Sequence, residues 1–270
     1  MPIAIQAALL GIVQGLTEFL PVSSSAHLIL ARAFFGWDSD QFGLSFDVAC
    51  HVGTLVAVLI YFRREVAAMI ASLPRLFQPA RDPDARMIWL LAVGTIPAIV
   101  AGLLFNERIE EHMRTPAVAA IALALGAIGL LIAERAGSKT RRDDSLSMGE
   151  ALLLGCAQAV ALLPGVSRSG ATMTVALLFG LRRAEAARFI FLLAIPAILA
   201  AAGHEAPRVL RAGLGGDQAT LFLIGVVTSA IVGYAAVRFF IRYLVNHSLD
   251  VFAWYRLGLA AAVAVWLLRA

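Results

Sequence analysis

Long apolar runs separated by short polar segments dominate the chain from end to end. A helix that spans a membrane needs about 20 mostly apolar residues. Six segments meet this requirement. The pattern therefore predicts an all-α polytopic membrane protein, in which residues 1–270 form a single membrane domain with spans at roughly residues 45–62, 87–106, 116–134, 185–203, 219–241 and 251–268.

Two further apolar stretches, residues 3–35 and 148–180, are interrupted near the middle by the breaker clusters Pro21–Ser25 and Pro164–Gly170. Proline cannot continue a helix, and serine or glycine beside it supplies caps and turns. Each stretch therefore predicts two short helices around a polar tip. Such a tip is tolerated at membrane depth when it is buried in protein or lines a wet cavity. We interpret both stretches as re-entrant hairpins, and a single kinked span in each is the alternative.

Composition supports a membrane protein. Hydrophobic residues make up 60% of the chain and charged residues 15%, with a mean hydropathy of +0.84. Because about a quarter of the residues of a soluble globular chain are charged, a soluble enzyme is excluded. The net charge of +4 is typical of basic cytoplasmic loops and does not indicate a nucleic-acid partner.

The basic residues test this layout. If neither hairpin crosses the membrane, fourteen basic residues lie on one side and six on the other, and Arg168 and Arg256 remain inside. The richer side is expected to be cytoplasmic, so both termini face outward. The six are Arg32, Arg108, Arg114, Arg208, Arg211 and Arg269, and the fourteen are Arg63, Arg64, Arg75, Arg81, Arg86, Arg135, Lys139, Arg141, Arg142, Arg182, Arg183, Arg188, Arg238 and Arg242.

An internal repeat relates the two broken stretches. A shift of 144 residues places Gly11–Ser25 on Gly155–Ser169 without a gap, and a Gly, a Gln, a Val and two Ser coincide. A weaker match pairs residues 94–102 with 225–233. Each half, residues 1–135 and 148–270, would then be one hairpin plus three spans. Three is an odd number of crossings, so the second half lies in the membrane with the opposite orientation to the first. The two polar tips then enter from opposite faces and can meet near the midplane, as in many transporters.

The two tips carry the chemistry. Glu18 and Gln14 share one helix face of the first hairpin, and Ser23, Ser24, Ser25 and His27 follow the break. The second tip offers Ser167, Arg168, Ser169 and Thr172. A permanent guanidinium, hydroxyls and free helix N-termini suit phosphate oxygens. Ser23 and Ser25 are better explained as helix caps. Asp47 and His51, four residues apart at the start of a span, are expected to support the structure and not to react.

Gln14–Ser24 resembles the first signature of the undecaprenyl-diphosphatase family of bacitracin-resistance type, and Pro164–Thr172 resembles the second. The likeness extends over nearly the whole chain, including Phe46–Thr54. It implies an integral enzyme of the bacterial cytoplasmic (inner) membrane, with its site on the outer, periplasmic side. The reaction implied is hydrolysis of undecaprenyl diphosphate to undecaprenyl phosphate and inorganic phosphate, which recycles the lipid carrier for peptidoglycan synthesis and gives bacitracin resistance.

The resemblance also assigns residues. Glu18, Ser24, His27 and Arg168 match catalytic positions, and Gln14, Ser167, Arg168, Ser169 and Thr172 match substrate- and phosphate-binding positions. Gln14 replaces one of two family carboxylates. A divalent cation, Mg²⁺ or Ca²⁺, at Glu18 is therefore an option that the spacing does not demand. Ser24, His27 or an activated water remains open as the nucleophile, and a homodimer is compatible with the sequence.

A lipid flippase or transporter is the rival function, because broken helices in an inverted repeat also suit transport. The two functions differ in the reactive residues that they require. Transport requires an anion clamp, but it does not require a serine and a histidine beside Glu18. The sequence therefore favours the hydrolase.

Overall fold

The computed structural model describes residues 1–37, 41–212 and 215–269. Within these ranges the chain forms eleven α-helices, two short 3₁₀ helices and no β-strand. Six helices are long and apolar enough to cross a membrane, as predicted. They are α3 (Leu44–Tyr61), α5 (Pro83–Met113), α6 (Pro116–Ala136), α9 (Arg183–Ala212), α10 (Gly216–Asn246) and α11 (Asp250–Leu267).

Three of the six helices, α5, α9 and α10, are clearly longer than the apolar pattern predicted, and α5 and α9 differ from it the most. The prediction ended near residues 106 and 203, whereas α5 continues to Met113 and α9 to Ala212. Both extensions carry charged residues. The search for runs of apolar residues leaves such residues out, although several of them are good helix formers. A short amphipathic helix that was not predicted, α4 (Arg63–Ala71), follows α3.

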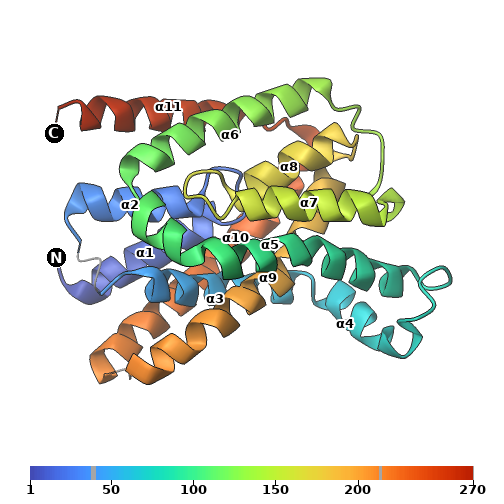
Figure 1. The fold of residues 1–270 in the computed structure, drawn as a ribbon, viewed down its shortest axis with the longest axis horizontal. Coiled ribbons are helices and arrows are strands. Elements are labelled where there is room, and N and C mark those ends of the chain that lie inside the picture. Colours follow the sequence, from blue (N-terminus) through green and yellow to red (C-terminus); the bar gives the residue numbers. More distant parts are fainter. Residues whose placement is uncertain (38–40, 213–214, 270) are drawn as a thin grey trace.

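Both broken stretches fold back on themselves. The first forms α1 (Ile3–Thr17) and α2 (Ser24–Phe35), and the second forms α7 (Met148–Val160) and α8 (Arg168–Leu178). Helix α1 packs against α2, and α7 packs against α8, as in a hairpin and unlike a single kinked span. In Figure 1 the α1–α2 hairpin enters from the left and the α7–α8 hairpin from the right, so their tips meet near the middle of the molecule.

The two tips adopt the same local conformation. Ser23 and Ser167 are the N-cap residues of α2 and α8, with φ of 74° and 75°. The Ser23 hydroxyl accepts a hydrogen bond from the amide of Ala26, and the Ser167 hydroxyl accepts one from the amide of Gly170. Residues other than glycine adopt positive φ only where the surroundings enforce it. The matching strain supports the predicted repeat, whose extension over the whole halves 1–135 and 148–270 stays a prediction.

The helices pack in three groups around the tips (Figure 1). Helix α10 packs against α1 and α3, α5 packs against α7, and α11 packs against α6. Aromatic residues link the first tip to this scaffold, because the Phe19 ring lies edge-on to Phe191 of α9 with centroids 5.1 Å apart. Large apolar side chains on the outer faces of α5, α6 and α10 are exposed, among them Leu104, Ile121 and Ile231. These faces are suited to lipid.

The basic loops gather at one end of the bundle. The loops after α3, α6, α8 and α10 lie at the right of Figure 1, and both termini lie at the left. The richer set of basic residues predicted from sequence belongs to these right-hand loops and the helix ends beside them. The charge asymmetry therefore coincides with the two ends of the helix bundle.

Close backbone contact between α5 and α7 gives a testable expectation for stability. A Cβ added at Gly155 would lie 2.3 Å from the carbonyl oxygen of Gly94, and backbone cannot give way. Gly155→Ala should therefore destabilise the protein by about 1–3 kcal/mol. Thermal unfolding in detergent measures this. Gly149→Ala in the same helix is the control, because its Cβ would meet nothing closer than 4.0 Å. Equal melting temperatures for the two variants would contradict the packing argument.

Candidate active site

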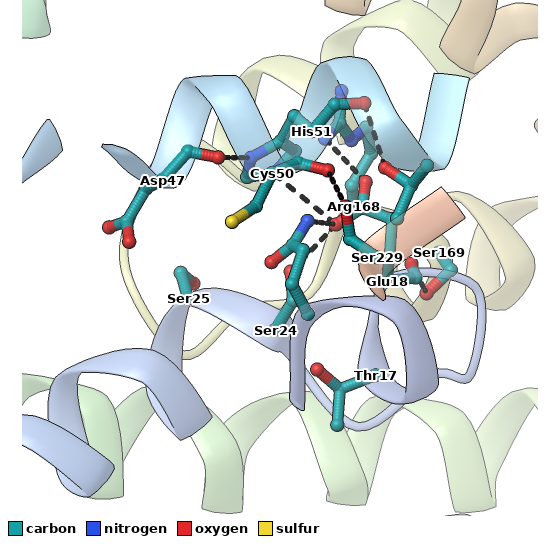
Figure 2. Close-up of polar contacts among 12 residues, drawn as sticks. Thr17, Glu18, Ser24, Ser25, Asp47, Cys50, His51, Arg168, Ser169 and Ser229 are labelled. Carbon is teal, nitrogen blue, oxygen red and sulfur yellow. Dashed lines mark hydrogen bonds and ion pairs between the residues drawn. The ribbon is translucent and has the colours of Figure 1, made fainter. Parts of the chain in front are cut away.

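Glu18, which follows α1, is the centre of a hydrogen-bonded cluster (Figure 2). One carboxylate oxygen, Oε2, accepts from the Gln14 side-chain amide at 2.9 Å and from the Ser24 hydroxyl at 2.7 Å. His51 Nε2 lies 3.3 Å from the same oxygen. The other oxygen, Oε1, accepts from Nη2 of Arg168 at 2.7 Å. Four donors from separate parts of the chain thus converge on one buried carboxylate.

The charges in this cluster compensate one another. The Glu18 side chain is 3% exposed, and burying an ionised carboxylate is costly unless it is paired and hydrogen-bonded. Arg168 supplies a permanent positive charge beside it. The tips of the two hairpins therefore share one ion pair, over a separation of 150 residues in sequence.

His51 faces acceptors with both ring nitrogens. Nδ1 lies 2.7 Å from the carbonyl oxygen of Asp47, and Nε2 faces the carboxylate of Glu18. Neither a carbonyl nor an ionised carboxylate can donate, so this environment favours a ring that carries a proton on each nitrogen. His51 is therefore equipped to give a proton to a bound group.

Arg168 is the first residue of α8, and its side chain is 22% exposed at the edge of a cavity. Within the described residues its side chain bonds Glu18 through Nη2, so its remaining N–H groups are available to a ligand in the cavity. The first amides of α2 and α8 also lack intrahelical partners, as at every helix start. Together they offer positive charge and N–H donors, an arrangement that suits an anion.

The two tips also touch through their serines. The Ser169 hydroxyl donates to the carbonyl oxygen of Leu20 at 2.9 Å, and the Gly165 amide lies 3.4 Å from the Ser25 hydroxyl. These contacts fix the tips relative to each other and give Ser169 a structural task. Thr172 donates to the carbonyl of Arg168 at 2.6 Å. Ser169 and Thr172 do not line the cavity, so their expected role in phosphate binding has no contact to support it.

His27 lies apart from the Glu18 cluster. Its Nδ1 is 2.7 Å from the carbonyl oxygen of Ser23, and its Nε2 is 2.7 Å from the Tyr255 hydroxyl. The rings of His27 and Tyr255 are nearly parallel, with centroids 5.7 Å apart. The catalytic role expected for His27 from sequence stays a prediction. The histidine beside Glu18 and Ser24 is His51, which we had expected to be structural.

A cavity of about 260 Å³ opens above this cluster. Its floor is polar and its walls come from apolar residues of α5 and α9, such as Ile99 and Ile198. Charged residues, among them Glu110, Arg114 and Glu205, also line it. The sequence-predicted residues that line it are Glu18, Ser24, Ser167 and Arg168, together with Ser23 and Ser25.

Gln158 is a further polar residue of the cavity that sequence reasoning did not assign to the site. Among the described side chains, Gln158 Nε2 and Gln14 Oε1 are buried without a hydrogen-bond partner. The signal was present, because Gln158 is the repeat counterpart of Gln14. An unpartnered buried donor is costly, so a phosphate oxygen in the cavity would be a favourable acceptor.

The donor set around Glu18 does not fit a divalent cation. Ca²⁺ takes six to eight oxygen ligands, and Mg²⁺ takes six, of which at least one is usually a carboxylate oxygen that is free to bind the ion. Both oxygens of Glu18 already accept from donors, one of which is the permanently charged guanidinium of Arg168. No group of three or more acidic, histidine or cysteine residues suited to a metal occurs in the described part of the chain. We therefore derive no step through a metal at Glu18.

An ion cluster beside the site holds the start of α3. Arg32 donates through two nitrogens to the two oxygens of Asp47, at 2.7 and 3.0 Å, and Arg114 also pairs with Asp47. His51 follows Asp47 by one turn and bonds its carbonyl oxygen. The cluster thus links α2, α3 and the end of α5 and fixes the helix that carries His51.

Comparisons with known proteins agree on one family. The family model described as "Bacitracin resistance protein BacA" matches residues 7–262. A protein of Rubrobacter xylanophilus called undecaprenyl-diphosphatase is 51% identical over 267 residues, which cover 98% of each chain. Undecaprenyl-diphosphatase 2 of Stutzerimonas stutzeri is 50% identical over 97% of each chain, and undecaprenyl-diphosphatase of Trichlorobacter lovleyi is 42% identical over 98% of each.

Proposed function

Because the chain belongs to the BacA family of bacitracin resistance proteins, we propose that it hydrolyses undecaprenyl diphosphate to undecaprenyl phosphate and inorganic phosphate. This membrane hydrolase recycles the lipid carrier for peptidoglycan synthesis, which also gives bacitracin resistance. The observation that carries the proposal is the convergence of Arg168, Ser24 and His51 on the carboxylate of Glu18 at the floor of one cavity. It joins an anion-binding group to groups that move protons.

The diphosphate is held by Arg168 and the N-terminal amides of α2 and α8. The unpartnered Nε2 of Gln158 donates a further bond. A cavity of about 260 Å³ accommodates the head group and the first part of the prenyl chain, whereas the rest of a long prenyl chain lies in the bilayer. The apolar walls from α5 and α9 suit that first part.

Ser24 is the nucleophile in the mechanism we propose. Its oxygen attacks the terminal phosphorus, and Glu18, 2.7 Å away, takes the hydroxyl proton. The anhydride P–O bond breaks, its electron pair goes to the bridging oxygen, and His51 protonates that oxygen. Water then attacks the phosphoserine and gives a proton to His51. Glu18 returns its proton to Ser24, and inorganic phosphate leaves, so the site is restored.

Two other nucleophiles were open from sequence. A water activated by the Glu18 cluster would bypass the phosphoserine, and His27 would attack directly. The hydrogen bond from Ser24 to Glu18 favours Ser24, whereas His27 bonds Ser23 and Tyr255 and does not line the cavity. Every residue of the proposed set belongs to a single chain, so the reaction does not require the homodimer that the sequence leaves open.

We further propose that the protein lies in the bacterial cytoplasmic membrane with the α1–α2 hairpin entering from the outer, periplasmic side. The clustering of basic loops at the opposite end of the bundle supports this orientation. The cavity lining includes Glu110 and Arg114, near the end of α5 that lies away from the basic loops. Substrate would then enter the site from the outer leaflet.

Phosphate release separates hydrolysis from lipid transport, the rival function. Purified protein in detergent should convert undecaprenyl diphosphate to equal amounts of undecaprenyl phosphate and inorganic phosphate, and protein-free micelles are the blank. The reason is that Ser24 and His51 add reactivity that an anion clamp does not need. Absence of phosphate release, together with movement of the lipid between leaflets in vesicles containing the protein, would overturn the proposal in favour of a flippase.

A further inference from the structure

We propose that Arg256 is a positioning residue of the hydrolase, whose buried guanidinium holds the two hairpin tips in the arrangement that brings Arg168 to Glu18. The proposal rests on the function proposed above. Arg256 lies on α11, is fully buried at 0% exposure, and does not line the cavity. It therefore acts on the reaction through other residues and does not touch the substrate.

The guanidinium bonds the backbone of both tips. Nη1 donates to the carbonyl oxygen of Pro21 at 3.2 Å, in the first tip. Nη2 donates to those of Gly165 at 3.1 Å and Val166 at 2.9 Å, in the second tip. Pro21 lies three residues from both Glu18 and Ser24, and Val166 lies two residues before Arg168. One side chain thus spans the two segments that carry the proposed reacting groups.

The same side chain is fixed to the scaffold. Nε donates to the carbonyl oxygen of Leu123 at 3.2 Å, and Nη2 lies 3.3 Å from that of Ala122, both on α6. Helix α6 packs against α11, so the guanidinium of Arg256 is fixed by two helices that do not belong to the tips. The tips are therefore attached to a common, rigid support.

The chemistry of the contact set explains why arginine is present. All five acceptors are carbonyl oxygens, and those of the tips lie where the helices are broken, so helical bonding does not satisfy them. Burying a charge without such partners would be costly. A lysine offers three donors around one point, whereas the planar arginine fork reaches several acceptors at once.

Two glycines leave the space that the fork occupies. A Cβ at Gly126 of α6 would lie 2.0 Å from Nη2 of Arg256, and one at Gly170 of α8 would lie 2.5 Å from Nη1. Gly129, one turn further along α6, is different, because its Cβ would meet only a methyl group of Thr174, at 3.7 Å. This difference allows the fork to be displaced without changing Arg256.

The experiment compares Arg256→Lys and Gly126→Ala with Gly129→Ala and with the unaltered protein. Phosphate release from undecaprenyl diphosphate is measured well below the melting temperature of each variant and normalised to folded protein. We expect kcat to fall about 10- to 100-fold in the first two variants, because misplacement of a catalytic group by an ångström has effects of this size. KM should change less than kcat, and Gly129→Ala should behave like the unaltered protein.

The melting temperature is the readout that separates positioning from mere stability. A fall of kcat in protein that melts near the normal temperature supports the proposal. Normal kcat in both Arg256→Lys and Gly126→Ala, or failure of both to fold, overturns it, since Arg256 would then be dispensable or purely structural. If the unaltered protein itself releases no phosphate, the proposed function fails instead, so the two failures are distinguishable.

Discussion

Replacement of Arg168 by alanine should abolish phosphate release, with a loss of about 10³-fold or more in kcat/KM. Arg168 is the permanent cation that pairs with Glu18 in the cavity, and a guanidinium that stabilises a transferring phosphoryl group is worth a factor of this size. The alanine variant also leaves Glu18 with His51 as its one cationic partner among the described contacts. The measurement is steady-state hydrolysis of undecaprenyl diphosphate by purified variants.

Two further variants make this result specific. Arg168→Lys keeps the charge but loses the fork, and it should recover a small part of the activity. Arg182→Ala removes an exposed arginine after α8, away from the cavity, and should leave the rate unchanged. Activity of Arg168→Ala within tenfold of the unaltered protein would remove Arg168 from the catalytic set.

His51→Ala is expected to lower kcat by about 10²- to 10⁴-fold, whereas His27→Ala should lower it by less than about tenfold. His51 faces Glu18 and lines the cavity, and His27 bonds Tyr255 outside it. The two substitutions remove the same side chain from different places, so each is the control for the other. Kinetic constants of both purified variants, compared at equal folded fraction, give the answer.

A substitution that keeps a donor sharpens this comparison. His51→Gln can still offer an N–H group near Glu18 but cannot transfer a proton, so it should recover stability without recovering kcat. Greater damage from His27→Ala than from His51→Ala would contradict our assignment and return the proton-transfer role to His27.

Much of the fold could be predicted because it follows from local rules. Six apolar runs predicted six helices, and Pro21 and Pro164 predicted the breaks between α1 and α2 and between α7 and α8. The ends of α5 and α9 were missed, because charged residues can continue a helix beyond the apolar region.

The candidate site could be predicted only in part. Glu18, Ser24 and Arg168 lie within two signatures, each of which is a continuous run of residues. The structure brings these three residues together. The contact of His51 with Glu18 joins segments that are separated in the sequence. The spacing of residues along a helix shows which of them share a face, but it does not show which other helix packs against that face. For the same reason, the spacing of Ser24 and His27 could not reveal that His27 faces Tyr255 of α11.

The ion pair between Glu18 and Arg168 has a consequence for the order of events in a turnover. While the cavity lacks a phosphate, the guanidinium is the counter-ion of the carboxylate, and it stabilises the ionised form of the group proposed as base. An incoming diphosphate competes for the same guanidinium. Any weakening of the pair between Arg168 and Glu18 by the phosphate would free the carboxylate to take the Ser24 proton when Ser24 has a phosphorus to attack. Substrate would in this way switch on the base that consumes it, and an empty site would stay inert toward water.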